Sequence, residues 1–517
     1  MQLELTHKNA ILTLKKATEK ECELMREKST VKAFSWQTKK SFEITYLRLN
    51  QFVMSGLWKR MLSIAQTTKI PVTIKGLIDT PEHMGLIDPQ ISRDVLDEWI
   101  DKHNFKFNPY WYQFECLYYA LKYRFSRCEV ATAGGKSFTI FLYCWYLLET
   151  GKVKPGDKIL VVTIRRMLVT QMISDFNEYQ DRYEVPFLKC DSVFSGGRKL
   201  AESNVVVGTY QTLSGYDKEY FEQFGAIVID ECHQAHITSI KDEIIPKLDL
   251  DKCHYRFGLS GTQPLENTPE GLHLEAYVGP ILFRISAAEL QEEGTIAKIQ
   301  VNMIKLMHPY EECKRFYHSP EIASDKVYEF LPFERQWVQY NNRRCIIIKH
   351  IVEKFVGNQI ILVENVDYAK HLVALLSTLE NKKVHLIYSA IKDKVRDEIK
   401  SSFENADNIV LVATYETMST GVSIKNIHAL HFPDGGKSRI RMRQSTGRGL
   451  RLHPSKEYLT VFDYVDVFKK PTKSQCEKLG VPEWPGPAIN RLYAQGKARK
   501  RIYEGEKFPV KEIEYKM

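Results

Sequence analysis

Short, almost uninterrupted apolar runs recur along the chain from about Phe105 onward and alternate with helix-length segments. Such runs are typical of parallel strands covered on both faces, because every side chain of such a strand is buried. In the first half these runs are Lys158–Thr163, Asn204–Gly208, Ala226–Glu231 and Arg256–Ser260, with helices expected at Lys136–Glu149 and Met167–Tyr179. The alternation predicts a doubly wound α/β domain.

A second alternation follows in the C-terminal half. Strands are expected at Gln359–Glu364, Val384–Tyr388, Ile409–Ala413, His428–Phe432 and Tyr458–Asp463. Helices are expected at Asp367–Leu379, Asp393–Phe403 and Ile440–Leu450. The fold class is therefore predicted as α/β, with two tandem doubly wound parallel-sheet domains.

The length of 517 residues is too great for one hydrophobic core, and about 150 residues per domain predict three or four units. Within the N-terminal region, Phe52–Gln66 has helical apolar spacing and Ile70–Gly76 resembles a strand. The second α/β domain is expected to begin between Phe283 and Val301. The expected order is a small α/β accessory domain (1–80), a linker (81–104), two α/β domains (105–290 and 291–470) and a basic helical tail (471–517).

Composition excludes several classes of protein. With 44% hydrophobic and 26% charged residues the chain does not resemble a disordered protein. No apolar run reaches the roughly 20 residues of a membrane-spanning helix, and charges interrupt the N-terminal apolar stretches, unlike a secretory signal. Ten cysteines without any C-x-x-C pair are expected to be reduced and to serve as small hydrophobic residues. A soluble intracellular protein is expected.

The net charge of +9 is weak evidence for a polyanionic partner by itself. Basic residues cluster at Lys437, Arg439, Arg441, Arg443, Arg448 and Arg451, and again at Lys497, Arg499, Lys500 and Arg501. Both clusters are compatible with phosphate contacts, although a solvated face is the ordinary interpretation of such runs.

A glycine-rich turn precedes the expected helix at Lys136–Glu149. It reads Ala131-Thr132-Ala133-Gly134-Gly135-Lys136-Ser137. A turn of this kind at a helix N-terminus presents N–H groups to the phosphates of ATP, with Lys136 as the cation and Ser137 as a Mg²⁺ ligand. The match is partial, because Val130 stands where the strict phosphate-loop pattern has glycine, and Gly-Lys-Ser alone also occurs in ordinary loops.

Two adjacent acids end the apolar strand Ala226–Glu231, in the phrase Asp230-Glu231-Cys232-His233. They are placed at the carboxyl edge of a parallel sheet, where ligands bind in such folds. Asp230 is expected to hold Mg²⁺, and Glu231 to orient and deprotonate the attacking water. Adjacent acids at a strand end are often only a solvated turn, but they rarely are when a phosphate loop precedes them in the same fold.

The second α/β domain contains Gln444-Ser445-Thr446-Gly447-Arg448-Gly449-Leu450-Arg451. Arg448 and Arg451 are three residues apart and share one face of a helix. Such arginines can stabilise the charge that develops on the γ-phosphate. A solvated basic helix would explain the arginines but not the register of Gln444, Gly447 and the two arginines.

Together these motifs resemble superfamily 2 helicases with a D-E-x-H box, over roughly residues 105–465. The resemblance implies two RecA-like lobes that bind one ATP from both sides. It further implies that Gln113 reads adenine, that His233, Ser260 and Thr262 couple hydrolysis to movement, and that Gly421 contacts the nucleotide. It places nucleic-acid contacts at Arg165, Arg166, Thr209, Gln211, Thr414 and Thr420.

A closer resemblance is to the phage UvsW family of recombination, repair and replication helicases. It is carried by Trp111-Tyr112-Gln113, Val207–Thr212, Phe257–Gly261 and Ser419–Asn426, and by the small α/β region at the N-terminus. It implies an ATP- and Mg²⁺-dependent motor on branched DNA that regresses forks, migrates Holliday junctions and unwinds R-loops or D-loops. It also implies RNA–DNA hybrids as substrates and the host cytoplasm as the location.

Two departures from the wider group stand out. Ile164-Arg165-Arg166 replaces the usual Pro-Thr-Arg, which leaves the details of strand contact open, and Ala131 stands where proline is frequent. Three alternatives also stay open: an RNA helicase, the motor subunit of a restriction system, and a non-catalytic DNA-binding protein with a degenerate motor fold.

Overall fold

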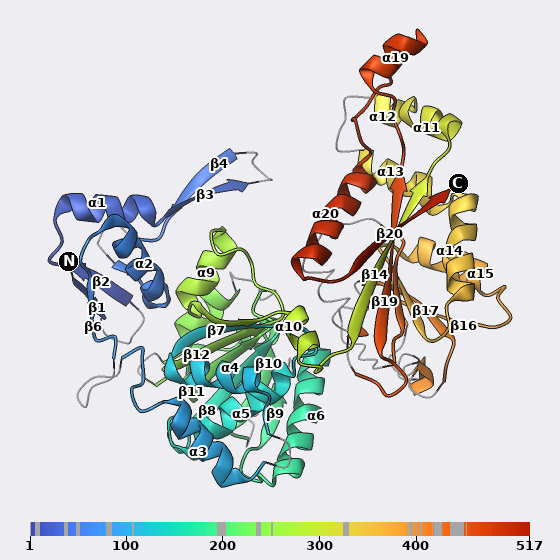
Figure 1. Cartoon of the computed structure of the whole chain (residues 1–517). Coiled ribbons are helices and arrows are strands. Elements are labelled where there is room, and N and C mark those ends of the chain that lie inside the picture. Colours follow the sequence, from blue (N-terminus) through green and yellow to red (C-terminus); the bar gives the residue numbers. More distant parts are fainter. Residues whose placement is uncertain are drawn as a thin grey trace. The chain divides into compact units, whose positions relative to one another are not determined.

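The computed structural model describes most of the chain (Figure 1). The described residues are 2–5, 11–35, 40–47, 52–78, 85–105, 108–193, 203–233, 239–249, 252–323, 330–388, 390–391, 395, 398–399, 401–403, 406–415, 417, 426–434, 449–450 and 452–517. They form two compact units, residues 1–131 with 135–285 and residues 132–134 with 286–517.

The first 78 residues, called the accessory region below, build a small mixed structure. Its sheet has the order β5-β2-β1-β6, in which β1 pairs antiparallel with β2 and parallel with β6. A separate antiparallel hairpin is formed by β3 and β4. The elements are β1 (Gln2–Leu5), β2 (Ile11–Lys15), α1 (Glu19–Lys28), β3 (Thr30–Ser35), β4 (Lys40–Thr45), β5 (Phe52–Met54), α2 (Trp58–Thr68) and β6 (Thr73–Lys75).

The helix expected at Phe52–Gln66 begins later than predicted. Residues Phe52–Met54 are strand β5, which pairs with β2, and a 3₁₀ turn at Ser55–Leu57 leads into α2. The apolar spacing does not distinguish the strand from the helix, because both elements bury consecutive parts of the same apolar run. The pairing partner of β5 lies about forty residues earlier in the chain, beyond the reach of local pattern.

The rest of the first unit, called the first lobe, alternates strands and helices as predicted. Its strands are β7 (Phe125–Val130), β8 (Lys158–Thr163), β9 (Cys190–Val193), β10 (Val205–Thr209), β11 (Phe224–Asp230), β12 (Tyr255–Ser260) and β13 (Ile281–Ile285). Its helices are α3 (Arg93–His103), α4 (Trp111–Lys122), α5 (Lys136–Glu149), α6 (Arg166–Tyr183), α7 (Tyr210–Ser214), α8 (Lys218–Phe221) and α9 (Pro269–Tyr277). Two helical turns, η3 (Ser239–Ile244) and η4 (Ile245–Lys247), precede β12.

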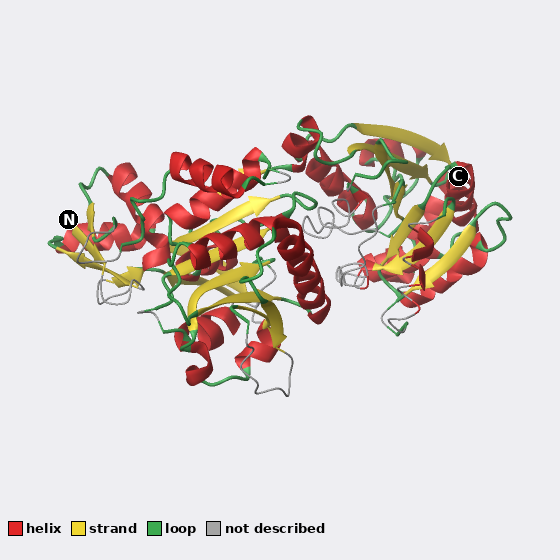
Figure 2. Ribbon diagram, turned by 90° about the horizontal axis from the view of Figure 1, so that it is seen from below, coloured by secondary structure: helices red, strands yellow, loops and turns green. Residues whose placement is uncertain are grey.

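These strands form one seven-stranded sheet in the order β13-β7-β12-β11-β8-β10-β9, and all of its pairs are parallel. Helices lie on both faces of the sheet (Figure 2). The strand expected at Lys158–Thr163 and the helix expected at Lys136–Glu149 have the predicted bounds. The predicted doubly wound α/β fold is confirmed for this lobe.

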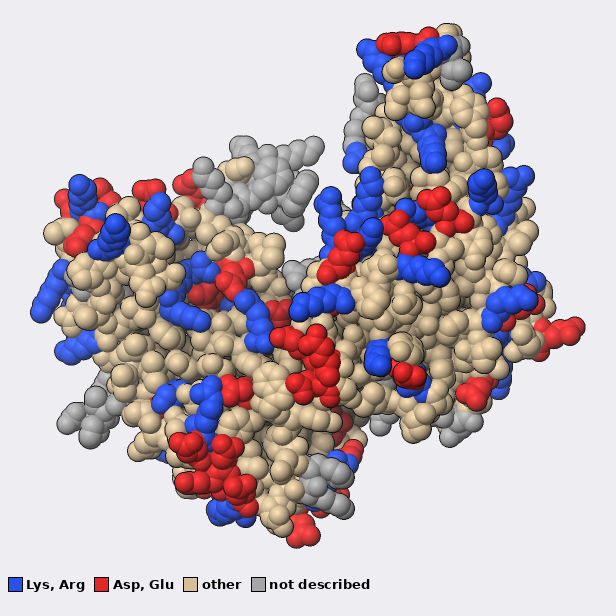
Figure 3. Space-filling view, in the orientation of Figure 1, with Lys and Arg blue, Asp and Glu red and all other residues tan. Residues whose placement is uncertain are grey.

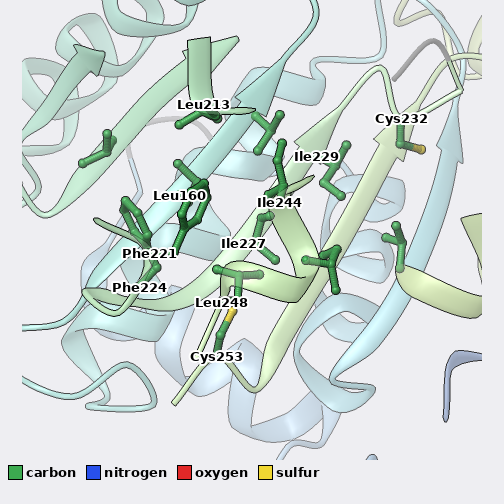
Figure 4. Packing of buried hydrophobic residues seen from close by; sticks show 14 of the residues in the cluster. Leu160, Leu213, Phe221, Phe224, Ile227, Ile229, Cys232, Ile244, Leu248 and Cys253 are labelled. Carbon is green, nitrogen blue, oxygen red and sulfur yellow. The ribbon is translucent and has the colours of Figure 1, made fainter. Parts of the chain in front are cut away.

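One face of this sheet is closed by a dense apolar cluster (Figure 4). Leu160 of β8 and Ile227 and Ile229 of β11 contribute from the sheet, and Leu213, Phe221 and Leu248 contribute from the connections above it. All six are almost completely buried. Burying such side chains stabilises a fold by about 1.5–3 kcal/mol each, so the strands that carry the site are held rigidly.

The second unit contains a second seven-stranded parallel sheet in the order β16-β17-β15-β18-β19-β14-β20. Its strands are β14 (Lys298–Met307), β15 (Gln359–Val363), β16 (Lys383–Ile387), β17 (Ile409–Thr414), β18 (Ala429–Phe432), β19 (Tyr458–Val467) and β20 (Val510–Lys516). Its helices are α10 (Ala287–Glu292), α11 (Tyr310–Tyr317), α12 (Pro320–Ala323), α13 (Phe330–Gln339), α14 (Asn342–Lys354), α15 (Val366–Leu376), α19 (Lys473–Leu479) and α20 (Arg491–Gly505).

The prediction of a second α/β domain is confirmed, and the sheet contains two strands that were not predicted, β14 and β20. The tail after Pro471 contains helices α19 and α20, as expected, but it ends in β20, which pairs with β14 along Val301–Met307. The strand alternates exposed and half-buried residues and so lacks the continuous apolar signal of a central strand. The helices expected at Asp393–Phe403 and Ile440–Leu450 fall largely outside the described residues.

The basic cluster at residues 497–501 divides into structural and exposed members. Arg499 is buried and donates to both carboxylate oxygens of Asp463, with Nε–Oδ2 at 2.8 Å and Nη2–Oδ1 at 2.6 Å. Lys500 lies 2.9 Å from Glu512. The interpretation of Arg499 as a phosphate contact is therefore wrong, because its guanidinium is committed to packing α20 against β19. On the face drawn in Figure 3, Lys and Arg are interspersed with Asp and Glu.

Two expectations from composition can be compared with the structure. None of the ten cysteines forms a disulfide, and nine of them are buried, which suits their predicted use as small hydrophobic residues. Among the described residues, no helix combines the length and the apolarity needed to cross a bilayer.

Candidate active site

The candidate site residues of the first lobe gather at the carboxyl edge of its sheet. The phosphate loop follows β7, Ser260 ends β12, Asp230 ends β11, and these three strands are neighbours. Parallel strands end at the same edge, so residues separated by more than a hundred positions in the chain become adjacent.

The phosphate loop makes the turn that its sequence predicts. Ala133 and Gly135 have left-handed backbone conformations, with φ of 72° and 69°, and Gly135 caps α5. A Cβ on Gly135 would overlap the Gln113 side-chain amide, so glycine is required there by space as well as by conformation. Lys136 and Ser137 then open the helix, whose first N–H groups have no partner within the helix and can bind anions.

Gln113 is buried beside this turn. Its Nε2 donates to the Gly135 carbonyl at 3.3 Å, and its Oε1 accepts from the Tyr110 N–H at 3.0 Å. The side chain therefore links α4 to the start of α5. Its predicted role as the adenine reader stays a prediction.

Lys136 and Glu231 face each other across the site. The Lys136 ammonium lies 3.6 Å from Glu231 Oε1, and both side chains are largely shielded from solvent. Glu231 has a left-handed backbone with φ of 48°, a conformation that costs a residue with a side chain about 1–3 kcal/mol and is concentrated at functional sites. The turn aims its carboxylate back over the end of the sheet toward Lys136.

Ser260 and His233 hold the other oxygen of Glu231. Ser260 Oγ donates to Glu231 Oε2 at 3.1 Å, His233 Nδ1 lies 3.4 Å from the same oxygen, and Nδ1 also hydrogen-bonds Ser260 Oγ. The Thr262 N–H donates to Ser260 Oγ at 3.2 Å. Burial lowers the pKa of His233, so the ring is neutral near pH 7. The structure thus brings two of the predicted coupling residues, Ser260 and His233, into contact with the predicted base, and Thr262 joins them through Ser260.

Asp230 is the more deeply buried acid. Burial and then the neighbouring Glu231 charge raise its pKa to about 7. Its Oδ1 is buried and has no hydrogen-bond partner among the described residues. A buried carboxylate oxygen without a hydrogen-bond partner is suited to bind a cation or a cation-bound water.

Ser137 and Asp230 fit the requirements of Mg²⁺, which prefers oxygen ligands and completes its shell with phosphate oxygens and water. Ser137 Oγ lies 3.2 Å from the Tyr179 hydroxyl, which fixes its position near the loop. No group of three or more His, Cys, Asp or Glu suited to a metal occurs among the described residues. A site with two protein oxygens and the ligand's own phosphates needs no such group.

Two predicted nucleic-acid contacts of the first lobe follow β8. Arg165 caps α6 and Arg166 is its first residue, with an exposed side chain. Thr209 ends β10, the neighbouring strand, and Gln211 follows it and is exposed. The ATP residues come from β7, β12 and β11, so the two groups occupy successive parts of one sheet edge.

Thr209 also has a local structural role. Its Oγ1 accepts from the Thr212 N–H at 3.3 Å and lies 3.0 Å from the Thr212 hydroxyl. In the second unit Thr414 makes the same pair of contacts with Thr417, at 3.4 and 2.8 Å. The sequence Thr-Tyr-x-Thr thus occurs at the ends of both β10 and β17. This repeat is the sequence signal that could have identified Thr212 and Thr417 as the hydrogen-bond partners of Thr209 and Thr414.

The remaining predicted site residues lie outside the described residues. They are Gln444, Arg448 and Arg451 of the predicted arginine helix, with Thr420 and Gly421 of the other second-lobe motif. Thr132 and Gly134 belong to the phosphate-loop turn around Ala133. The roles assigned to all of these residues stay predictions.

One further contact near the site was not anticipated from the sequence. Gln263 accepts from Arg127 Nη1 at 3.1 Å and its Nε2 lies 3.3 Å from the Cys232 sulfur. Cys232 lies between Glu231 and His233 in the sequence. Its contact with Gln263 therefore joins the candidate site to the loop that follows β12. Local pattern does not reveal such a contact, because Arg127 and Gln263 are far apart in sequence.

Comparison with known proteins agrees with this geometry. Residues 95–265 match the family "Type III restriction enzyme, res subunit", and residues 343–453 match "Helicase conserved C-terminal domain". The ATP-dependent DNA helicase uvsW of Enterobacteria phage T4 is 30% identical over 486 residues, which cover 90% of this chain and 92% of that protein. The chain belongs to the UvsW family of ATP-dependent DNA helicases. As a member of this family it is an ATP-hydrolysing enzyme with two RecA-like domains.

More distant similarity extends beyond the UvsW family. A type I restriction enzyme EcoAI endonuclease subunit of Escherichia coli is 26% identical over 68% of this chain and 45% of that protein. The solved structure of the type ISP restriction-modification enzyme LlaBIII bound to DNA matches 80% of this chain and 32% of that chain, with a TM-score of 0.53 and 15% identity. This structural likeness shows the shared fold.

Proposed function

We propose that this UvsW-family enzyme is an Mg²⁺-dependent DNA motor that acts on branched DNA. The observation that supports the proposal best is the connected set Lys136–Glu231–Ser260–His233 at the sheet edge. It joins the phosphate-binding turn to the residues that the resemblance assigns to coupling. The phage T4 helicase matches 90% of this chain and is named an ATP-dependent DNA helicase.

Lys136 is suited to bind the β- and γ-phosphate oxygens of ATP, together with the N–H groups that open α5. Its ammonium lies 3.6 Å from Glu231 Oε1, so the carboxylate is beside the position proposed for the phosphates. Glu231 would accept a proton from the attacking water, while Ser260 and His233 keep its second oxygen oriented. Ser137 and Asp230 would hold Mg²⁺, which would supply positive charge beside the phosphates.

The second lobe is proposed to contribute Arg448 and Arg451, which would stabilise charge on the γ-phosphate, with Gln444 beside them. Nucleic acid is proposed to contact Arg165, Arg166, Thr209 and Gln211 of the first lobe and Thr414 and Thr420 of the second. Contacts of these kinds go mainly to the backbone of the nucleic acid and carry little sequence information. We therefore expect binding that is tolerant of sequence and weakened by salt.

The substrate is tested by ATP turnover and unwinding on five ligands: forked DNA, a four-way junction, linear duplex, single-stranded DNA and RNA. Forked and four-way DNA should stimulate turnover most and should be remodelled. Lys136→Ala should abolish turnover on every ligand and keep DNA affinity, because the lysine is proposed to bind the phosphates of ATP and not DNA. Equal stimulation by linear duplex and junctions would contradict the branched-DNA proposal.

The same panel separates the alternatives. Greatest stimulation by RNA would indicate an RNA helicase. Translocation on linear duplex without unwinding would indicate a motor of the restriction type, which the likeness to the EcoAI subunit favours as the second candidate. Persistent turnover in Lys136→Ala would refute the assignment of the ATP site.

A further inference from the structure

The accessory region and the first lobe share one apolar core. Trp58 and Met61 of α2 lie in the same buried cluster as Leu272 and Ala276 of α9. The Trp58 ring stacks on Tyr123 at 5.9 Å with an angle of 9° between the planes. Gly56 lies so close to α9 that a Cβ would overlap the carbonyl oxygens of Glu275 and Ala276. The accessory region is therefore built onto the first lobe at α9.

Arg60 of α2 adds a set of polar contacts to this junction. Its Nε and Nη2 donate to Glu275 Oε2 at 3.1 and 2.9 Å. Its Nη2 also donates to the Glu266 carbonyl and its Nη1 donates to Asn267 Oδ1, both at 3.1 Å. Glu275 is only 5% exposed, so Arg60 supplies the counter-charge to a buried carboxylate. One guanidinium thus binds both ends of the segment Glu266–Glu275, called the α9 segment below.

The α9 segment is also tied to the ATP site. Gln263, which contacts Cys232 between Glu231 and His233, precedes Glu266 by only Pro264 and Leu265. The Glu266 side chain pairs with Arg284, which lies 3.2 Å from Glu129 of β7, the strand that leads into the phosphate loop.

The intervening turn has little freedom. A Cβ on Gly271 would overlap the Leu265 carbonyl, so the turn packs tightly on the first residues of α9. Tyr46 of the accessory region donates its hydroxyl to the Pro269 carbonyl at 3.5 Å, and its ring contacts His273 at 5.9 Å. Tightly packed segments of this kind transmit displacement instead of absorbing it.

We propose that the accessory region contacts nucleic acid and that Arg60 is a positioning residue: it ties this region to the α9 segment and transmits the binding to Ser260 and Thr262. Ser260 orients Glu231, so a shift of the α9 segment changes the alignment of the base without any contact between Arg60 and ATP. The inference rests on the proposed function, because it takes nucleic acid as the stimulating ligand.

The test compares ATP turnover of the full chain without DNA and with saturating forked DNA. In Arg60→Ala, basal turnover and the KM for ATP should stay close to wild type, because Ser260, His233 and Glu231 keep their mutual contacts. The ratio of stimulated to basal turnover should fall about fivefold or more, the size of typical coupling between sites. Lys59→Ala, which changes the neighbouring exposed lysine, is the matched control and should keep the ratio.

Variants on the lobe side exclude a direct contact between Arg60 and DNA. Glu275→Gln should lower the stimulation ratio as Arg60→Ala does, and the double variant should be no worse than either single one. Arg60→Lys should be intermediate, since an ammonium cannot span all three acceptors. A normal ratio in Glu275→Gln would show that Arg60 acts on DNA itself and would overturn the proposal.

Two further outcomes are decisive. An unchanged ratio in Arg60→Ala overturns the proposal, including the case in which thermal stability and basal turnover fall together, which is the signature of a purely structural residue. A wild-type chain that hydrolyses ATP but is not stimulated by any nucleic acid would instead refute the proposed function.

Discussion

At the scale of single residues, the surroundings of each side chain decide what it does. Arg499 looks from the sequence like a phosphate contact, but it is buried against Asp463. Glu231 is held by Lys136 on one oxygen and by Ser260 on the other. Asp230, its neighbour, is buried with one oxygen that has no partner among the described residues. Two adjacent acids therefore have different environments, as different roles in catalysis require.

Arg448 is predicted to act on the γ-phosphate during hydrolysis. If it stabilises charge that develops only in the transition state, Arg448→Ala should lower kcat by about a thousandfold or more while the Kd for ATP changes little. Single-turnover hydrolysis and equilibrium nucleotide binding measure the two quantities. Lys497→Ala, which removes an exposed basic residue from α20, is the control. A large loss of ATP affinity with unchanged kcat would exclude the predicted role.

At the scale of elements, the ends of β14 and β19 are joined to helices by a buried polar network. His308 Nε2 lies 3.0 Å from Asp466 Oδ1, and its Nδ1 lies 3.2 Å from Glu312. Arg344 donates to the same Asp466 carboxylate and to the Tyr368 hydroxyl. Groups so deeply buried are stable only when they are paired. The network thus fixes α11 and α14 on the sheet.

This network predicts a pH dependence of stability. Burial would lower the pKa of His308, but its hydrogen bond to Asp466 and the nearby Glu312 carboxylate outweigh burial and raise the pKa above 6.5. The folded state therefore binds this proton more tightly than the unfolded state. The resulting stabilisation is present in full below about pH 6.5 and is lost as the pH rises through the higher folded value.

Denaturant unfolding measured from pH 6 to pH 9 checks this prediction. The free energy of unfolding should fall over this range in the wild type, and His308→Gln should remove part of the fall. His318→Gln, which changes an exposed histidine ten residues along, should leave the profile unaltered. Identical profiles for the wild type and His308→Gln would contradict the assigned pKa direction.

At the scale of the whole molecule, the accessory region is part of the first unit and not a separately tethered module. Its core cluster includes Phe125 of β7 as well as residues of α9. Removal of residues 1–80 would therefore expose apolar surface of the first lobe, including Tyr123 beside Trp58. Point variants at the junction test the accessory region more cleanly than its deletion does.

Gly56→Ala is expected to destabilise this junction. The added methyl would overlap two backbone carbonyl oxygens of α9, and overpacking of this kind costs about 1–3 kcal/mol. Urea unfolding should show the loss as a lower midpoint for the first unit. Gly215→Ala is the control, because the nearest atom to its added Cβ would be at an ordinary contact distance of 3.5 Å. Equal midpoints for the two variants would show that the junction tolerates displacement.

The sequence alone determined the features that depend on neighbouring residues. Apolar runs predicted four strands of the first sheet (β8, β10, β11 and β12) and five of the second (β15 to β19), because strands buried on both faces must be apolar throughout. The glycine-rich turn and the paired acids predicted the nucleotide side chains, because parallel strands bring their carboxyl ends to one edge. Lys136, Glu231 and Ser260 meet in the structure for this reason.

Only the tertiary structure decided the features that depend on distant partners. β20 forms a strand because it pairs with the edge of β14, although its own hydrophobic pattern is weak. Arg499 is structural because Asp463 lies beneath it, and Arg60 reaches the α9 segment although more than two hundred residues separate them. Local sequence determines which chemical groups a residue carries. Long-range packing determines which of those groups are bound by other residues and which can contact a ligand.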